Sequence, residues 1–123
     1  MDSAEIVRAL FERMQARDWA GAREVMAVDA VITYSATGEV FSGTSFMAMN
    51  EAYPEGWTIE IIDIVAADDR VAAQIRVPNG GQIDWLSGFY TVCDGVIVEG
   101  HEHWVTEHAE PAPDWRRPFT ANG

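Results

Sequence analysis

The first half of the chain carries apolar residues at the spacing of amphipathic helices. Residues 3–17 form one such stripe, and a second, short helix is expected after Asp18, whose side chain is a good N-cap. Two short strands are expected over residues 30–43, on either side of a glycine turn. A third helix is expected over residues 44–53, capped by one of its first two residues.

The apolar pattern changes to a period of two in the second half of the chain, which indicates β-strands. Asp94 and Gly95 form the dipeptide that favours a two-residue hairpin of type I′. Helices followed by long antiparallel strands are typical of an α+β fold. We therefore expect a curved antiparallel sheet wrapped over the N-terminal helices as a cone with an internal pocket. The expected strands span residues 57–67, 71–77, 82–93 and 96–107.

The composition is that of one soluble globular domain over residues 1–123. Of the 123 residues, 48% are hydrophobic and 23% are charged. No apolar run is long enough to cross a bilayer, the N-terminus lacks the basic segment of a secretory signal, and Cys93 is the one cysteine. We expect a cytoplasmic protein without a membrane partner. A proline-rich tail from about residue 109 is expected to lie over the surface.

The charge of the chain excludes several classes of function. The formal net charge is -12 at pH 7, so the surface repels phosphate backbones and nucleic acid is not an expected partner. The sequence contains no lysine, which excludes Schiff-base chemistry and the lysine of a nucleotide-binding P-loop. We expect a protein that uses no cofactor.

Four segments occur in an order that resembles a known superfamily: "RDWAGAREVMAVDAVITY", "GTSFMAMNEAY", "DDRVAAQIRV" and "VCDGVIVEGHEHWV". In this order and spacing the chain resembles the nuclear transport factor 2-like superfamily, and most of all its bacterial SnoaL-like branch. The resemblance implies a cone-shaped α+β fold, a pocket between sheet and helices, and often a dimer through the outer face of the sheet. Because members include cyclases, isomerases, dehydratases, epoxide hydrolases and non-enzymatic binders, the resemblance implies no single activity.

The resemblance permits a test for ketosteroid isomerase chemistry. That pattern has a carboxylate base just after the first strand, a tyrosine on the first helix and a protonated acid on the penultimate strand. The matching positions here are Tyr34, Leu10 and Gly88, and none carries the required side chain. Isomerisation by that set of residues is therefore not expected.

The pattern of the epoxide hydrolases is also incomplete. It has an arginine and an aspartate two residues apart on the strand "VAAQIRV", and a second aspartate on the last strand. The first two positions match the apolar residues Ile75 and Val77, and the last matches Glu102. The water-activating network is therefore missing, although Glu102 can still act as an acid or a base.

Glu102 is the leading candidate for an acid/base group. SnoaL-like cyclases use an acidic pocket residue, and the resemblance directs the face of Gly100, Glu102 and Trp104 inward unless a bulge inverts it. A carboxylate in an apolar pocket has a raised pKa, which suits acid/base catalysis. The alternative is that Glu102 hydrogen-bonds Tyr34 or Tyr90 and only stabilises the core. The candidate catalytic residues are Glu102, Tyr34 and Asp84, and the candidate ligand-binding residues are Tyr90, Trp104, Trp19, Trp57, Met14, Ile75 and Leu86.

The run "GHEHWVTE" also allows a metal-site interpretation. His101, His103 and Glu107 fit the first half of a cupin motif, because histidines two apart on a strand can share one metal. A cupin needs a third histidine on a later strand, and only His108 remains. With the Glu102 face inward, as the resemblance implies, alternation places both histidines on the outer face. We therefore expect no bound metal, and the cupin-like site is a remote alternative.

The outer face of the sheet is expected to be aromatic. Trp85 and Phe89 share the outward parity of the two histidines, which is more typical of a subunit interface than of a ligand site. We therefore expect a homodimer.

Two hypotheses remain for the function. The first is a metal-free acid/base enzyme (a cyclase, isomerase or hydrolase) acting on a small apolar molecule. The second is a non-catalytic module for ligand binding or dimerisation.

Overall fold

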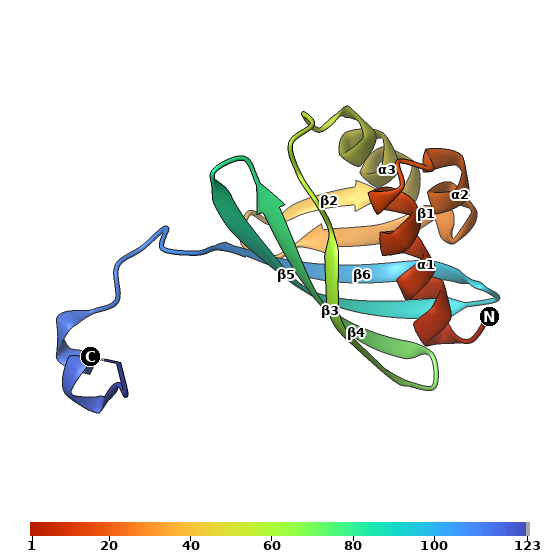
Figure 1. The fold of residues 1–123 in the computed structure, drawn as a ribbon. Helices are drawn as coiled ribbons and strands as arrows, with labels where there is room; N and C mark the ends of the chain where they lie inside the picture. The colour runs from red at the N-terminus through yellow and green to blue at the C-terminus, as the bar shows by residue number, and fades with distance from the viewer. Residues whose placement is uncertain (123) are drawn as a thin grey trace.

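The computed structural model describes residues 1–122 and confirms the α+β architecture, with helices on the concave side of a curved, unclosed sheet (Figure 1). None of the helices in this part of the chain has the length and apolar character needed to cross a bilayer. The elements are α1 (Ser3–Gln15), α2 (Trp19–Glu24), β1 (Met26–Tyr34), β2 (Glu39–Ser42), α3 (Gly43–Ala52), β3 (Glu60–Ala67), β4 (Arg70–Asn79), β5 (Gln82–Cys93), β6 (Val96–Thr106) and the 3-10 helix η1 (Asp114–Phe119).

The helices begin at side chains that accept a hydrogen bond from the first turn. Asp2 caps α1, and Asp18 caps α2 as expected from the sequence. For α3 the expected cap is wrong, because the side chain of Ser42 caps the helix and α3 begins at Gly43. The first helix also ends two residues earlier than expected. Arg17 has a φ of 59° and turns its guanidinium back onto the carbonyl oxygens at the helix end.

The sheet has the strand order β2-β1-β6-β5-β4-β3, and one pair in it is parallel. The expectation of a wholly antiparallel sheet is therefore wrong for β1 and β6, which run side by side in the same direction. Strand β1 forms a hairpin with β2 at one edge of the sheet, and the last strand, β6, pairs with the other side of β1. Strand β3 begins at Glu60, later than expected, and Trp57 makes only an isolated bridge to Asn79.

A tight turn and a bulge set which face of β6 points inward. Asp94 and Gly95 have φ values of 51° and 80°, so the expected type I′ turn is confirmed. Beyond the turn, Val92 pairs with Ile97 and Thr91 with Glu99, which leaves an extra residue in β6 between those two pairs. The bulge precedes Gly100, so the simple alternation of faces holds from there to the end of the strand.

The hydrophobic core lies between the concave face of the sheet and the helices α1 and α3 (Figure 1). It closes one end of the cone, where the N-terminus and the β5–β6 turn lie. At the opposite end, the β1–β2 and β4–β5 turns and the end of β6 surround an opening. The side chains at the centre of this core include Val7, Leu10, Ile32, Ile75, Leu86 and Ile97.

Two glycines on neighbouring strands leave room for one tyrosine ring. The ring of Tyr90 lies across the inner face of the sheet, next to Gly88 on its own strand and Gly100 on β6. A Cβ atom at Gly88 would collide with the Tyr90 hydroxyl, and one at Gly100 would lie 3.0 Å from Cδ1 of the ring. Both positions therefore have to lack a side chain for Tyr90 to be buried.

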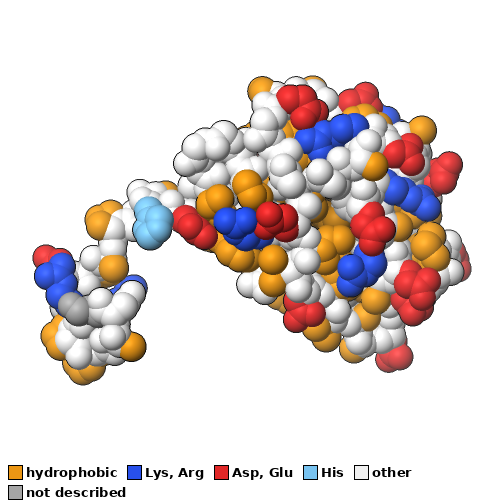
Figure 2. Space-filling model, viewed as in Figure 1, with side chains coloured by type: hydrophobic (Ala, Val, Ile, Leu, Met, Phe, Trp, Pro, Cys, Tyr) orange, Lys and Arg blue, Asp and Glu red, His pale blue; other side chains and the backbone are white. Residues whose placement is uncertain are grey.

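The tail beyond β6 does not lie over the surface as expected. We call residues 108–122 the arm and residues 1–107 the body. The arm runs away from the body to η1, and Figure 2 shows it standing clear in space-filling form. The last backbone hydrogen bond to the rest of the sheet is donated by Glu107 to Ile83, after which the bonds of the arm join it to Thr106 or to itself.

We predict that Gly88→Ala destabilises the fold by ~1–3 kcal/mol, the range for overpacking of a well-packed core. The added methyl group would force the Tyr90 ring from its place. The free energy of unfolding in urea measures the effect. Gly81→Ala is the matched control, because a Cβ there meets nothing within 4 Å. Equal stability of the two variants would contradict the packing of Tyr90 described here.

Candidate functional site

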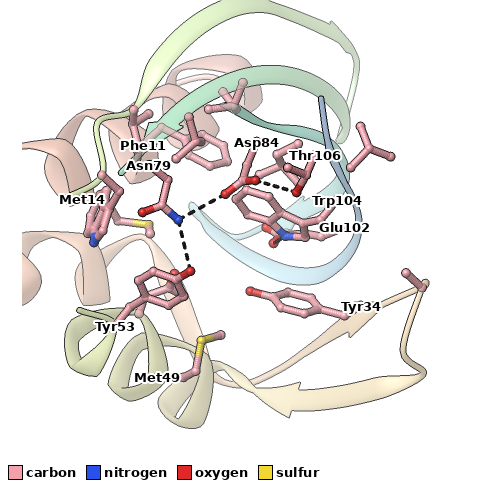
Figure 3. A pocket seen from close by; sticks show the side chains of 18 of the residues that line it. Phe11, Met14, Tyr34, Met49, Tyr53, Asn79, Asp84, Glu102, Trp104 and Thr106 are labelled. Carbon is pink, nitrogen blue, oxygen red and sulfur yellow. Dashed lines mark hydrogen bonds between the residues drawn. The ribbon is translucent and has the colours of Figure 1, made fainter. Parts of the chain in front are cut away.

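A cavity of about 370 Å³ opens at the wide end of the cone, near the lower limit for small-molecule pockets. Its walls come from α1, α3 and the inner faces of β1, β4, β5 and β6 (Figure 3). Most of the lining is apolar or aromatic, and among residues 1–122 Asp84 and Glu102 are its only charged members. The apolar and aromatic lining includes Phe11, Met14, Phe46, Met49, Trp57, Ile75, Val77, Leu86 and Trp104.

Glu102 lies in the wall of this cavity with an exposed fraction of 1%. The structure thus places it on the inner face of β6, as the alternation with Trp104 indicates. Its Oε2 accepts a hydrogen bond of 2.6 Å from the Tyr90 hydroxyl, and its Oε1 accepts one of 3.1 Å from the Trp104 indole N–H. Both oxygens are therefore held in place by donors from β5 and β6, and Tyr34 is not one of them.

Burial raises the pKa of Glu102 from 4.5 to about 7. Loss of hydration is the largest cause, and the hydrogen bonds from Tyr90 and Trp104 oppose it by favouring the charged form. None of the basic residues in the described part of the chain lines the cavity to stabilise the carboxylate further. A carboxyl group with a pKa near neutrality can both accept and release a proton at physiological pH, as general acid/base catalysis requires.

Tyr34 directs its hydroxyl into the same cavity from the end of β1 (Figure 3). Its ring packs edge-on against Phe41 and Phe46, which fixes its position. Burial raises the pKa of the Tyr34 hydroxyl well above its ordinary value, and the negative charge of Glu102 raises it further, while the Trp104 N–H partly offsets the rise. Tyr34 therefore stays protonated and can donate a hydrogen bond to a ligand oxygen.

Asp84 lies at the mouth of the cavity rather than beside Glu102. It pairs with Thr106, four residues farther along β6 than Glu102. Its oxygens accept hydrogen bonds from Thr106 at 2.7 Å, Gln82 at 2.9 Å and Asn79 at 3.2 Å. These three donors hold the Asp84 side chain at the rim, away from Glu102.

Several polar residues of this rim were not identified from the sequence. The Asn79 amide bridges Asp84 and the Tyr53 hydroxyl, and Thr106 completes the group (Figure 3). Thr106 shares the parity of Glu102 and Trp104, so the alternation along β6 could have identified it. Asn79 lies beyond the strand expected over residues 71–77, because β4 extends through it to the two following glycines.

Two of the residues expected to bind a ligand do not line the cavity. Trp19 packs edge-on against Trp57 with 6.3 Å between ring centroids, and it is Trp57 that faces the cavity. Tyr90 is 1% exposed and lies behind Glu102, so it can influence a ligand only through that carboxyl group. The remaining candidates, Met14, Trp57, Ile75, Leu86 and Trp104, all line the cavity.

The histidines of β6 lie on the outer face of the sheet, away from the cavity. His101 contacts Glu99 at 3.0 Å, and Glu107 accepts a hydrogen bond from the Trp85 indole instead of approaching a histidine. Among residues 1–122 there is no cluster of three or more His, Cys, Asp or Glu side chains suited to a metal ion. The geometry thus gives no support to the cupin-like interpretation of His101, His103 and Glu107.

The pKa of Glu102 predicts a pH-dependent cost to stability. Between pH 4.5 and about 7 the folded protein retains a proton that the unfolded chain has lost. The contribution of Glu102 to the free energy of unfolding is therefore most favourable below this window and falls by up to ~3 kcal/mol as pH rises through it. Glu102→Gln should remove this fall, because the amide can accept from Trp104 and donate to the Tyr90 hydroxyl. Urea unfolding at pH 5 and pH 8 measures the difference. A variant equally destabilised at both pH values would show that the carboxylate is a net stabilising group.

A second prediction concerns the hydrogen bond from Tyr90. Because this bond favours the charged carboxylate, Tyr90→Phe should raise the pKa of Glu102 by ~1–2 units above that of the parent. The side-chain indole N–H signal of Trp104 in NMR spectra reports the titration, since this N–H contacts the carboxylate. Tyr34→Phe is the matched control and should shift the midpoint less. A lower midpoint in Tyr90→Phe would show that the hydroxyl does not stabilise the charge.

Comparison with known proteins agrees with this geometry. A family model described as the SnoaL-like domain matches residues 7–114. A ketosteroid isomerase candidate from Kribbella flavida has a similar structure, with a TM-score of 0.86 and 21% identity over 96% of this chain and 87% of that chain. IdmH, a polyketide cyclase candidate from Streptomyces antibioticus, matches with a TM-score of 0.73 and 21% identity over 88% and 94% of the two chains.

A third similar structure is an LEH-like epoxide hydrolase from M. tuberculosis, with a TM-score of 0.71 and 17% identity over 84% of this chain and 82% of that chain. At these identities the structures show a shared fold and no shared reaction. No protein of curated function matches the sequence. Because the family model covers most of the chain and the fold agrees, the protein belongs to the SnoaL-like domain family, within the nuclear transport factor 2-like fold.

Proposed function

We propose that the protein binds a small, largely apolar molecule in its cavity and catalyses a proton transfer on it, as an isomerase or a cyclase does. The observation that carries this proposal is the carboxyl group of Glu102, fully buried in the wall of an apolar cavity and with a pKa of about 7. A carboxyl group buried in this way lowers the stability of the fold. A role in acid/base catalysis explains why the residue is present there.

In this proposal, Glu102 removes a proton from a carbon next to a carbonyl group of the ligand. The electron pair of the broken C–H bond moves toward the carbonyl oxygen, and the Tyr34 hydroxyl donates a hydrogen bond to the oxyanion that forms. Protonated Glu102 then returns the proton to another atom of the ligand. In a cyclase, the carbanion instead attacks a second carbonyl carbon of the ligand, and Glu102 gives its proton to the alkoxide oxygen that forms. Tyr90 and Trp104 orient the carboxyl group throughout.

The charges of the cavity favour a neutral ligand over an anion. Glu102 and Asp84 are both acidic, and within residues 1–122 no arginine or histidine lines the cavity to bind a carboxylate or phosphate. The net charge of -12 acts in the same direction at longer range. Hydrolysis of epoxides has less support, because Ile75 and Val77 present apolar side chains where a water-activating network would stand.

A non-catalytic binding module is the second candidate. Both oxygens of Glu102 already accept a hydrogen bond inside the protein, which is what a purely structural carboxyl group would also show. In either case the expected protein is cytoplasmic and works without nucleic acid, membrane, metal or cofactor.

Exchange of α-protons for deuterium separates the two candidates. Cyclic ketones of one and two rings, such as cyclohexanone and 2-tetralone, are incubated with the protein in D₂O, and proton NMR follows the loss of the α-proton signals. We expect catalysed exchange on at least one ketone that binds, and a fall of ~10²–10⁴-fold in its rate in Glu102→Gln.

Asp84→Asn is the control for this experiment, because it changes a carboxylate of the same cavity at the rim. It should retain most of the exchange rate. Ketones that bind but exchange no faster than in buffer would contradict the enzyme proposal and favour the binding module.

A further inference from the structure

The mouth of the cavity carries polar side chains that the proposed reaction does not use. We call Tyr53, Asn79, Asp84 and Thr106 the rim group. They come from the residue after α3, the end of β4, the start of β5 and the end of β6, and all four line the cavity (Figure 3). Hydrogen bonds join them in one series, from Tyr53 through Asn79 and Asp84 to Thr106. Four separate elements thus bring polar atoms to one place at the mouth.

The backbone at the rim group is fixed by neighbouring segments. Asn79 forms a bridge with Trp57, which lies between α3 and β3. The Gly80 amide, in the β4–β5 turn, donates a hydrogen bond of 3.1 Å to the Gly56 carbonyl oxygen. The turn is therefore attached to the segment that follows Tyr53. Because the rim group is already ordered, a ligand does not have to supply the free energy of ordering it.

Asp84 fixes the direction of the Asn79 side-chain amide. A carboxylate can only accept hydrogen bonds, so the NH₂ group of Asn79 faces Asp84, at 3.2 Å, and its carbonyl oxygen does not. The same NH₂ group donates to the Tyr53 hydroxyl oxygen, also at 3.2 Å. Neither the Asn79 carbonyl oxygen nor the hydroxyl hydrogen of Tyr53 takes part in these bonds. The rim group thus offers a ligand one acceptor and one donor.

One hydroxyl group of a ligand fits both of these atoms. The amide nitrogen and oxygen of Asn79 are bonded to the same carbon atom, so the oxygen also lies near the Tyr53 hydroxyl. A single ligand oxygen between them can donate its hydrogen to the Asn79 carbonyl oxygen and accept the hydrogen of Tyr53. An ether oxygen has no hydrogen to donate and can make only the second bond. The rim group is therefore suited to a hydroxyl group.

The rim group and Glu102 lie at two different levels of the cavity wall. Glu102 and Thr106 are four residues apart on β6, which is about 13 Å of strand. Between these levels, Leu86 and Trp104 pair with each other and line the cavity with an aliphatic and an aromatic side chain. A ligand that extends from Glu102 to the rim group therefore has an apolar body with one polar group at each end.

A ligand that fills this cavity also displaces water from the rim group. The cavity of about 370 Å³ is small, so the outer end of a two-ring molecule comes close to the mouth. Asn79 and Asp84 are half-buried even without a ligand. A polar atom that loses its water without gaining a new partner weakens binding, and a site built for a hydroxyl group discriminates against analogues that lack it. The rim group therefore selects among ligands of the same body.

We propose that the ligand carries a hydroxyl group at the end opposite its reactive carbonyl group, and that Tyr53 and Asn79 bind this hydroxyl at the mouth of the cavity. Asp84, held by Thr106, keeps the Asn79 amide in the orientation that accepts the hydroxyl hydrogen. The proposal rests on the proposed function, which places the carbonyl group beside Glu102. It adds that the substrate is a hydroxy ketone.

Three ketones that differ in one substituent test this proposal. The 6-hydroxy, 6-methyl and 6-methoxy derivatives of 2-tetralone share one two-ring body, and the substituent lies at the end opposite the carbonyl group. NMR titration of the protein gives their dissociation constants, with the indole N–H signal of Trp104 as the reporter from the cavity wall. We expect the hydroxy ketone to bind ~5–100-fold more tightly than the other two, because it gains two hydrogen bonds. Equal dissociation constants for all three would overturn the proposal.

The variant Tyr53→Phe removes the donor of the rim group and keeps the ring. Tyr53 is 47% exposed, so the fold should be unchanged by circular dichroism. The ratio of the dissociation constants of the methyl and hydroxy ketones should fall ~2–10-fold, the effect of one hydrogen bond. Tyr34→Phe is the matched control at the other end of the cavity, and it should affect both ketones alike. An unchanged ratio in Tyr53→Phe, or a fall only in Tyr34→Phe, would contradict hydroxyl binding at the rim group.

These measurements do not require turnover, so they separate this proposal from the proposed reaction. Tighter binding of the hydroxy ketone without exchange of its α-protons in D₂O would support the role of the rim group and contradict the reaction. Exchange of α-protons on all three ketones with equal binding would support the reaction and contradict the role of the rim group.

Discussion

The buried carboxyl group of Glu102 is the constraint on which the inner face of the sheet depends. It carries no compensating positive charge, so its two hydrogen-bond donors have to come from neighbouring strands with the correct direction and length. Trp104 supplies one from two residues along β6, and Tyr90 supplies the other across the ladder. The tyrosine can reach only because Gly88 and Gly100 leave its ring space. The burial of Glu102 thus explains which residues occupy four other positions of β5 and β6.

The same arrangement explains why Gly88 stands where the pattern of the ketosteroid isomerases has a protonated acid. Here the Tyr90 hydroxyl fills the space above the glycine and contacts Glu102. The acidic group of the cavity therefore lies on β6, and the Tyr34 hydroxyl faces the ligand space from the adjacent strand β1, where Tyr34 pairs with Glu102. A family pattern compared position by position does not detect such a rearrangement.

Alternation along β6 shows only which residues share a face, and the family resemblance indicates which face points inward. The helices and strands could be predicted because they depend on local patterns: helical spacing, period-two alternation and the Asp94-Gly95 turn. The parallel pairing of β1 with β6 could not, since it depends on which distant strand is adjacent. Trp19 was misassigned because an aromatic residue on a helix does not reveal whether it lines a cavity or supports another residue that does. Asn79 was missed because its two following glycines indicate a turn but not how far the strand extends before them.

The position of the opening has a practical consequence for work with this protein. The mouth of the cavity and the start of the arm lie at one end of the body, where Thr106 hydrogen-bonds Asp84 at the rim. The N-terminus lies at the other end, where the Ser3 hydroxyl contacts the turn between β3 and β4. An affinity tag or a surface linkage should therefore be attached at the N-terminus. A tag or linkage attached just after Thr106 in the sequence would lie next to the entrance of the cavity, through which any ligand has to pass.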